Sequence, residues 1–430
     1  MPLEPVLKQT FWNLSDRYLA AIAPTRLVQA PAAERLQDRH FVILTPSDVG
    51  NLGDEAMVTS VVSQLSSRAS CARITLITHL PGDMESYRDF ETDIVCLEGF
   101  FSKTPSLEVC DRLGDLFQTA TDFILLGADI LDGRYSRTRS FRRLFLARQA
   151  ERAGLNVHVL GFSFSDKAIA PITDYMRREC VGFSYCCRDP LSAERIGKVV
   201  GKSHENGADL AFLLPIPDAP LTEACERADA RISEWRRAGK KIIAINANPL
   251  GLISAFPGID LKETAAKISA GLDLIAEKTG CVFLGLTHDN RPGHSDARLM
   301  KAVLDGMNSD AEVHFVSETI RARDIKYLCR QVDLTVTGRM HLGIASLGAG
   351  TATMILDFQG KVRGLFDLFG LPDMALDVND LVRPDVFSAT VADRLLRHNE
   401  IADVVRSRLN DIHALSARNI DLVLATTGEA

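Results

Sequence analysis

One short segment places a permanent cation and an imidazole at the end of an apolar run. Arg339 and His341 follow residues 334–337, which we interpret as a buried strand, and Gly338 precedes a helical pattern. Arginine can hold a carboxylate or a phosphate through two parallel hydrogen bonds. Histidine can move a proton near neutral pH. Lys361 follows the next predicted strand and is expected at the same rim. We therefore predict an anion site at Arg339 and Lys361, with His341 as the acid or base. A structural histidine is the alternative.

A second arginine follows an earlier apolar run. Arg188 comes directly after residues 183–187, and the Asp189-Pro190 pair suits the cap and first position of a helix. Arg188 is then expected at the end of a sheet, where it could contact an anionic donor. An internal salt bridge is the alternative.

Three polar loops also follow predicted strands. The loop at 50–56, GNLGDEA, has two glycines for a tight turn and supplies Asn51 and Asp54. Asp129 lies in the loop LGADILDG and could accept hydrogen bonds from hydroxyl groups. His288 lies in the loop THDNRPGH, whose two histidines and aspartate could ligate a metal. No further Cys, His or carboxylate lies at partner spacing, so we predict no metal site. Asn51, Asp54, Asp129 and His288 are the candidates for contacts with a second substrate, and a purely structural turn is the alternative for each.

The elements that must position these residues are short apolar runs that alternate with helical patterns. Such runs predict parallel strands covered on both faces. The fold class is therefore α/β, with two Rossmann-like, doubly wound domains that face each other across a cleft, and with ligands beyond the carboxyl ends of the strands. The predicted parts are an N-terminal helical extension (1–39), a first Rossmann-like domain (40–214), a linker and helix (215–240), a second Rossmann-like domain (241–384) and a C-terminal helical tail (385–430).

Composition limits the classes of function. The 430 residues are 46% hydrophobic and carry a net charge of −7, which indicates a globular chain with no general attraction for nucleic acid. No apolar run reaches the length that spans a bilayer, and the nine scattered cysteines fit reduced, buried thiols. The amphipathic start is unlike a signal peptide, so we expect a cytoplasmic protein. Packing on the fold is the expected role of the apolar residues of this start, and peripheral contact with the inner face of a membrane is the alternative. These residues are Phe11, Trp12, Leu14, Tyr18 and Leu19.

Several of these segments, in this order and spacing, resemble the polysaccharide pyruvyl transferase family. They are GNLGDEA, LGADILDG, CRDPLS with GADLAFLLP, and the long block GRMHLGIASLGAGTATMILDFQGKVRGLFDLFGLP, within residues 41–372. The resemblance implies a fold similar to the glycosyltransferase-B architecture, with the acceptor on the first domain and the donor on the second. By position, Arg339 and His341 match the family's Arg-x-His donor site, Arg188 its Arg-Asp pair, and Asn51 and Asp54 its N-terminal loop. One departure is Gly127-Ala128-Asp129, where the family has consecutive glycines.

The resemblance implies transfer of the pyruvyl unit of phosphoenolpyruvate to sugar hydroxyls, giving a ketal on a surface polysaccharide, an exopolysaccharide or its lipid-linked precursor. No cofactor or metal is expected beside the donor phosphoenolpyruvate, and the second partner is a saccharide or a lipid-linked oligosaccharide. A glycosyltransferase of the same fold that uses a nucleotide sugar is the first alternative. A non-enzymatic scaffold in a polysaccharide assembly complex is the second.

Overall fold

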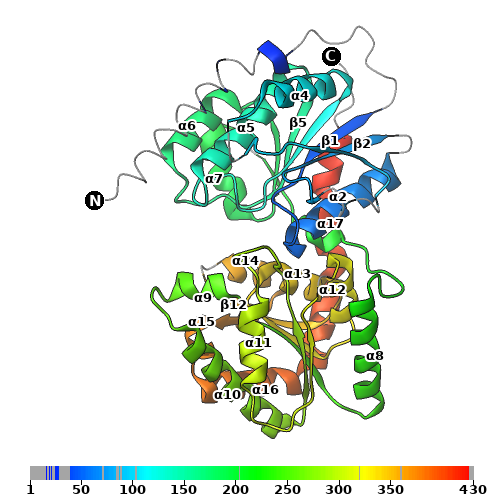
Figure 1. The fold of residues 1–430 in the computed structure, drawn as a ribbon, viewed down its shortest axis with the longest axis vertical. Coiled ribbons are helices and arrows are strands. Elements are labelled where there is room, and N and C mark those ends of the chain that lie inside the picture. The colour runs from blue at the N-terminus through cyan, green and yellow to red at the C-terminus, as the bar shows by residue number, and fades with distance from the viewer. Residues whose placement is uncertain are drawn as a thin grey trace. The chain divides into compact units, whose positions relative to one another are not determined.

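The computed structural model describes residues 16, 19, 21, 25–28, 39–69, 72–83, 87, 90–101, 104–202, 204–318, 320–358 and 361–425. These residues form two compact units (Figure 1). Unit 1 contains Met57–Leu210, together with the described residues up to Val49 and from Leu415 onward. Unit 2 contains Ala211–Ala414 together with Gly50–Ala56. The GNLGDEA loop is therefore part of unit 2, although it follows the first strand of unit 1.

Unit 1 is built on a seven-stranded sheet in the order β3-β2-β1-β4-β5-β6-β7, and every pairing in it is parallel. The central strands β1 and β4 are apolar after their first residue and are buried along their whole length, as expected when helices cover both faces. The strands are β1 (His40–Leu44), β2 (Arg73–Thr78), β3 (Asp93–Cys96), β4 (Asp122–Leu126), β5 (Asn156–Phe162), β6 (Ser184–Cys187) and β7 (Glu205–Asn206).

Helices cover both faces of this sheet. They are α2 (Leu52–Arg68), α4 (Leu107–Thr119), α5 (Arg137–Arg152), α6 (Ala170–Glu179), α7 (Pro190–Val200) and α17 (His398–Leu424). Figure 1 shows α4, α5, α6 and α7 on one face, with the later parts of α2 and α17 on the other. The last turns of α17 are tied to unit 1 by side chains. Ser416 donates to the carbonyl oxygen of Asp209 (2.7 Å), and the Asn419 side chain bonds both the amide of Gly161 (2.9 Å) and the carbonyl oxygen of Ala208 (3.1 Å).

The core of unit 1 also includes residues that precede its first strand. Leu19 and Leu27 are buried, at 1% and 0% exposure, within the apolar cluster of this unit. The side chain of Leu19 therefore packs on the fold, which confirms the expected role for this residue. The other four residues named for that contact, Phe11, Trp12, Leu14 and Tyr18, lie outside the described residues.

Unit 2 repeats the same plan with six parallel strands in the order β10-β9-β8-β11-β12-β13. The strands are β8 (Ile242–Asn246), β9 (Val282–Leu286), β10 (Val313–Val316), β11 (Leu334–Thr337), β12 (Ala352–Asp357) and β13 (Ala375–Asp377). Both sheets confirm the predicted α/β class with parallel, helix-covered sheets. The predicted C-terminal helical tail is also present, as two successive helices, α16 (Pro384–Leu396) and α17.

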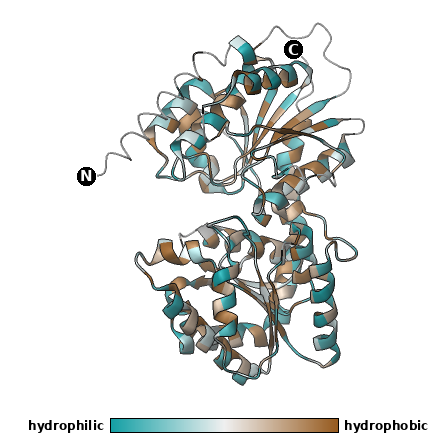
Figure 2. Ribbon diagram, viewed as in Figure 1, coloured by the Kyte–Doolittle hydropathy of each residue, from teal (hydrophilic) through white to brown (hydrophobic). Residues whose placement is uncertain are grey.

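Two of the longer helices of unit 2, α8 (Glu223–Arg237) and α10 (Leu261–Thr279), begin at a residue whose side chain caps the helix. Asp260 accepts the amides that start α10, and Gly280 ends that helix in the left-handed region at φ 65°. Figure 1 shows α10, α11 and α16 on one face of the sheet and α8 and α12 on the other, and Figure 2 shows the hydrophilic residues along outer helices such as α8. The remaining elements are α8 (Glu223–Arg237), α9 (Pro249–Ala255), α10 (Leu261–Thr279), α11 (Ala297–Asp305), α12 (Ala322–Cys329), α13 (Met340–Gly348), α14 (Lys361–Phe369), α15 (Val378–Leu381) and the short 3₁₀ turns Leu210–Leu213 and Pro372–Met374.

Two further observations concern the described residues as a whole. Their eight cysteines are free thiols, and Cys71 lies outside the described residues. Among the helices that the structure describes, none combines the length and apolarity needed to cross a membrane.

Candidate functional site

The site in unit 2 is organised by a buried carboxylate that sequence reasoning missed. Asp296 is 0% exposed and lies between the loops that follow β8, β9 and β11. One of its oxygens accepts hydrogen bonds from Nε and Nη2 of Arg339, at 3.0 and 2.7 Å. The other accepts from the Asn246 side chain and from the amides of His288 and Asp289, at 3.0, 3.1 and 3.3 Å. Asp296 therefore joins the carboxyl ends of β8 and β9 to the guanidinium of Arg339, which follows β11.

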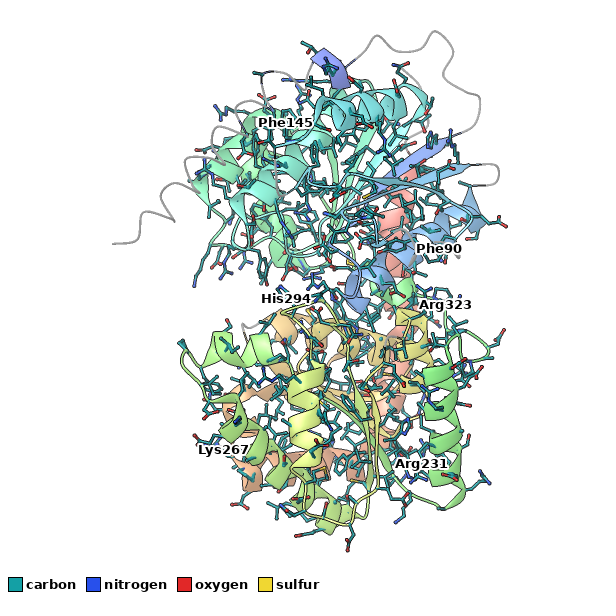
Figure 3. The ribbon with its side chains drawn as sticks, in the orientation of Figure 1. Phe90, Phe145, Arg231, Lys267, His294 and Arg323 are labelled. Carbon is teal, nitrogen blue, oxygen red and sulfur yellow. The ribbon has the colours of Figure 1, made fainter. Side chains whose placement is uncertain are left out.

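A second buried carboxylate, Asp289, completes an ionic network. Arg291 binds it with two bonds, from Nε at 3.0 Å and Nη2 at 2.7 Å, and Nη1 of Arg339 lies 3.3 Å from Oδ2. Arg339 also donates from Nη2 to the carbonyl oxygen of His294, a residue labelled in Figure 3 (2.9 Å). Two arginines thus balance two aspartates. The Arg339 side chain, 16% exposed, is fixed in place and has most of its N–H groups engaged.

Two histidines lie beside this network. His341 is the second residue of α13 and is half-buried, while His288 is buried at the end of β9. Burial lowers the pKa of His288 well below its usual value, and the nearby His341 and Arg339 lower it further. His288 is therefore a neutral imidazole, whereas His341 borders both His288 and the end of β11.

The N-terminal loop packs against the same residues. The amide of Leu52 donates to the carbonyl oxygen of His288 (3.0 Å), and the amide of Asn290 donates to that of Gly50 (2.7 Å). Within the loop, Asn51 accepts from the amide of Gly53 and donates to Asp54, both at 3.0 Å. Asn51 and Asp54 therefore hold the start of α2, and the structure brings them together with His288, Arg339 and His341 in unit 2.

Arg188 occupies the corresponding edge of unit 1. Its side chain is buried, Nη1 donates to Asp209 (3.0 Å), and Nε donates to Ser163 (2.7 Å). Burial alone would lower the pKa of Arg188, but the charges of Asp209, Asp129 and Asp189 raise it above its usual value. The internal salt bridge that the sequence left as an alternative is therefore present.

Asp129 follows β4 in the glycine-poor turn of unit 1. Its carboxylate accepts a hydrogen bond from the hydroxyl of Tyr135 (3.1 Å), whose ring is 67% exposed. The charge of Asp129 and its hydrogen bond with the phenol raise the pKa of Tyr135. Ala128 has φ +43°, so a residue with a side chain stands in the left-handed region that favours glycine.

The remaining candidate is Lys361. It is the first residue of α14, which follows β12, and its side chain is outside the described part of the structure. Within the ranges that are described, no three His, Cys, Asp or Glu side chains gather as they would around a metal ion.

The comparisons with solved structures agree with this architecture. The two parallel-sheet units have a glycosyltransferase-B-like fold. The structures that match include the MnaA–UDP co-structure from S. aureus (TM-score 0.60, 10% identity, 91% of this chain and 98% of that one). UDP-GlcNAc 2-epimerase from Neisseria meningitidis matches with TM-score 0.55 and 11% identity (90% and 100% covered), and a glycosyltransferase from Rickettsia africae with 0.59 and 9% (92% and 100%). At these identities the likeness concerns the fold alone.

The family is shown by sequence. The family described as Polysaccharide pyruvyl transferase matches residues 51–359, and the chain belongs to this family of transferases. A relative is the Amylovoran biosynthesis protein AmsJ of Erwinia amylovora, 23% identical over 248 residues. That match covers 52% of this chain and 58% of AmsJ, less than two thirds of the relative's length.

Proposed function

We propose that this protein transfers the pyruvyl unit of phosphoenolpyruvate to two hydroxyls of a sugar and closes a ketal during the synthesis of an exopolysaccharide. Membership of the family supports the reaction class, and the name of AmsJ supports a role in polysaccharide biosynthesis. The observation that carries the proposal is the arrangement in unit 2. Arg339 is fixed by two buried carboxylates, and His341 follows it by two residues at the carboxyl edge of the sheet.

The proposed chemistry starts with protonation of the methylene carbon of phosphoenolpyruvate, which leaves its central carbon electrophilic. A sugar hydroxyl attacks that carbon and loses its proton. Inorganic phosphate then leaves, and a second hydroxyl of the same sugar takes its place, so one phosphoenolpyruvate and one diol give a ketal and phosphate. His341 is the proposed acid or base in these steps. The cations Arg339 and Lys361 are proposed to stabilise the charge on the carboxylate and the leaving phosphate.

The other predicted contacts receive different roles in this proposal. Arg188 directs its guanidinium to Asp209 and Ser163, so we expect it to hold the loop after β6 in place. Asp129 is the proposed contact for acceptor hydroxyls, since its carboxylate already accepts from a hydroxyl group, that of Tyr135. We propose no metal and no cofactor beside the donor, because the proton transfers can be made by side chains and by the substrate.

The test is thermal unfolding with phosphoenolpyruvate, followed by an assay for ketal and phosphate in the presence of saccharide acceptors. A donor at ~100 times its dissociation constant stabilises by about 2.7 kcal/mol. Arg339→Lys is preferable to Arg339→Ala, because it keeps the charge between the two aspartates and removes the planar fork. We expect this variant to lose donor protection. His341→Gln should keep it and lower ketal formation by ~10² to 10⁴.

The same experiment separates the alternatives. Protection by uridine or guanosine diphosphate, without a response to phosphoenolpyruvate, would favour a glycosyltransferase that uses a nucleotide sugar. A protein that responds to none of these ligands, and forms no ketal with any acceptor offered, would favour the scaffold. Near-normal ketal formation by His341→Gln would remove His341 from the mechanism.

A further inference from the structure

Gly53 lies directly against the imidazole of His341. A Cβ atom added to this glycine would stand 2.4 Å from Nδ1, 2.5 Å from Cγ and 2.6 Å from Cβ of His341. Real Cβ atoms do not approach other atoms so closely. The contact reaches Cβ of the histidine as well as its ring, so a rotation of the ring alone could not relieve it. The backbone of Gly53 is not at positive φ, and close packing is therefore the reason that this position needs glycine.

The segment that carries Gly53 is held from several directions within unit 2. On one side, Gly50 and Leu52 exchange backbone hydrogen bonds with the loop after β9, at Asn290 and His288. On another, the carboxylate of Glu55 accepts the amide of Ala322 at the start of α12 (2.8 Å). A larger residue at position 53 would therefore have to displace His341, because its own backbone has little room to retreat.

We propose that the first turn of α2 is the wall that sets the orientation of the His341 side chain, with Gly53 as its positioning residue. This inference rests on the proposed function, in which His341 is the acid or base. It gives the GNLGDEA motif a role distinct from substrate contact. The motif follows a strand of unit 1, yet it supplies the packing surface for a histidine that lies nearly three hundred residues further along the chain.

The test compares two glycine-to-alanine variants in helices. Gly53→Ala adds a methyl group against His341, while Gly364→Ala in α14 adds one where no atom lies within 4 Å. Neither glycine is at positive φ, so the control isolates the contact from the general effect of alanine in a helix. We expect Gly364→Ala to leave the unfolding midpoint unchanged or raise it slightly. We expect Gly53→Ala to lower it by roughly 2–12 °C, the range for an overpacked contact in a unit of this size.

A double-mutant cycle with His341→Gly identifies the partner, because glycine removes Cβ as well as the ring. In that background, Gly53→Ala should cost no stability. An equal loss in both backgrounds would show that the added methyl group strikes something else and would overturn the proposal. If Gly53→Ala alone does not fold, the double variant decides: its recovery supports the proposal, and its failure to fold overturns it.

Two further readouts separate positioning from general damage. In ¹H–¹⁵N spectra of the histidine side chains, the signals that disappear in His341→Gly should shift in Gly53→Ala and stay in place in Gly364→Ala. In the ketal assay, Gly53→Ala should lower kcat by ~10- to 100-fold and change the KM for phosphoenolpyruvate little. The spectra and the cycle need no activity, so they test the positioning even if the proposed function fails. Unshifted His341 signals in Gly53→Ala would contradict the proposal.

Discussion

Replacement of Asp296 by asparagine is the sharpest test of the network around Arg339. The change keeps the size of a side chain that is 0% exposed and removes its charge. One carboxylate oxygen faces two N–H groups of Arg339, and the other faces three N–H groups of unit 2. An amide has one acceptor end and one donor end. Whichever way the new amide turned, its N–H groups would face other N–H groups on one side.

The expected loss follows from burial and from what remains. Removal of one partner from a buried ion pair costs about 3–5 kcal/mol. Asp289 still lies 3.3 Å from Nη1 of Arg339, so the guanidinium keeps one anionic neighbour and the loss should be near the lower end, about 3 kcal/mol. For a unit of about 200 residues, this corresponds to a fall of roughly 6–12 °C in the unfolding midpoint.

The assay is thermal and urea unfolding of Asp296→Asn beside a surface control. Asp305→Asn also removes one negative charge, from an ion pair with Lys301 at the surface. The side chains of Asp305 and Lys301 are 61% and 68% exposed. Such a pair contributes less than ~0.5 kcal/mol, so the control should move the midpoint by at most about 2 °C. Phosphoenolpyruvate should also protect Asp296→Asn less than it protects the parent. A midpoint for Asp296→Asn that equals that of the control would refute the reasoning.

Two other predictions concern unit 1. Burial, with the charge of Arg143, lowers the pKa of His79 to about 3 from a usual value of 6.5. His79 is thus neutral when folded, and its stabilising contribution is present above pH 6.5 and is lost as the pH falls toward 3. Between pH 7.5 and 5 this should cost about 2 kcal/mol, and urea unfolding of His79→Gln should show a pH dependence weaker by that amount. In the turn after β4, Gly127→Ala would place Cβ 2.5 Å from Cβ of Phe162 and should cost ~1–3 kcal/mol. Ala128→Gly relieves the left-handed backbone at φ +43° and should shift the midpoint by less than about 2 °C; equal losses in the two variants would contradict this.

The sequence alone predicted those features of the fold and the site that depend on residues close together in the chain. Continuous apolar runs predicted the parallel strands, since a strand covered on both faces has no polar side to show. The same argument placed Arg339 and His341 at a strand end, and the structure has them after β11. The cap at Asp189 was also visible, because a helix start needs a side-chain acceptor close in sequence.

Partners distant in sequence were not predictable. Nothing in GNLGDEA indicates that it packs against the loop after β9, because that contact depends on chain separated from it by more than two hundred residues. Asp296 was missed for the same reason. One signal was present: Asn246 is a polar residue at the end of a buried apolar strand, and a buried amide requires a partner. The side-chain N–H groups of Asn246 would have indicated that a buried acceptor such as Asp296 lies nearby.

The return of α17 to unit 1 has a consequence for synthesis on the ribosome. Residues from Leu415 onward complete unit 1, and Ser416 and Asn419 bond backbone groups at 161, 208 and 209. Unit 1 therefore lacks its last helix while about two hundred further residues are translated, which takes roughly 10–40 s. During that interval the nascent chain exposes the surface that this helix will cover. Unit 2 is synthesised during this interval, so chaperones that bind emerging chains would meet unit 1 without its last helix until the residues from Leu415 onward have emerged.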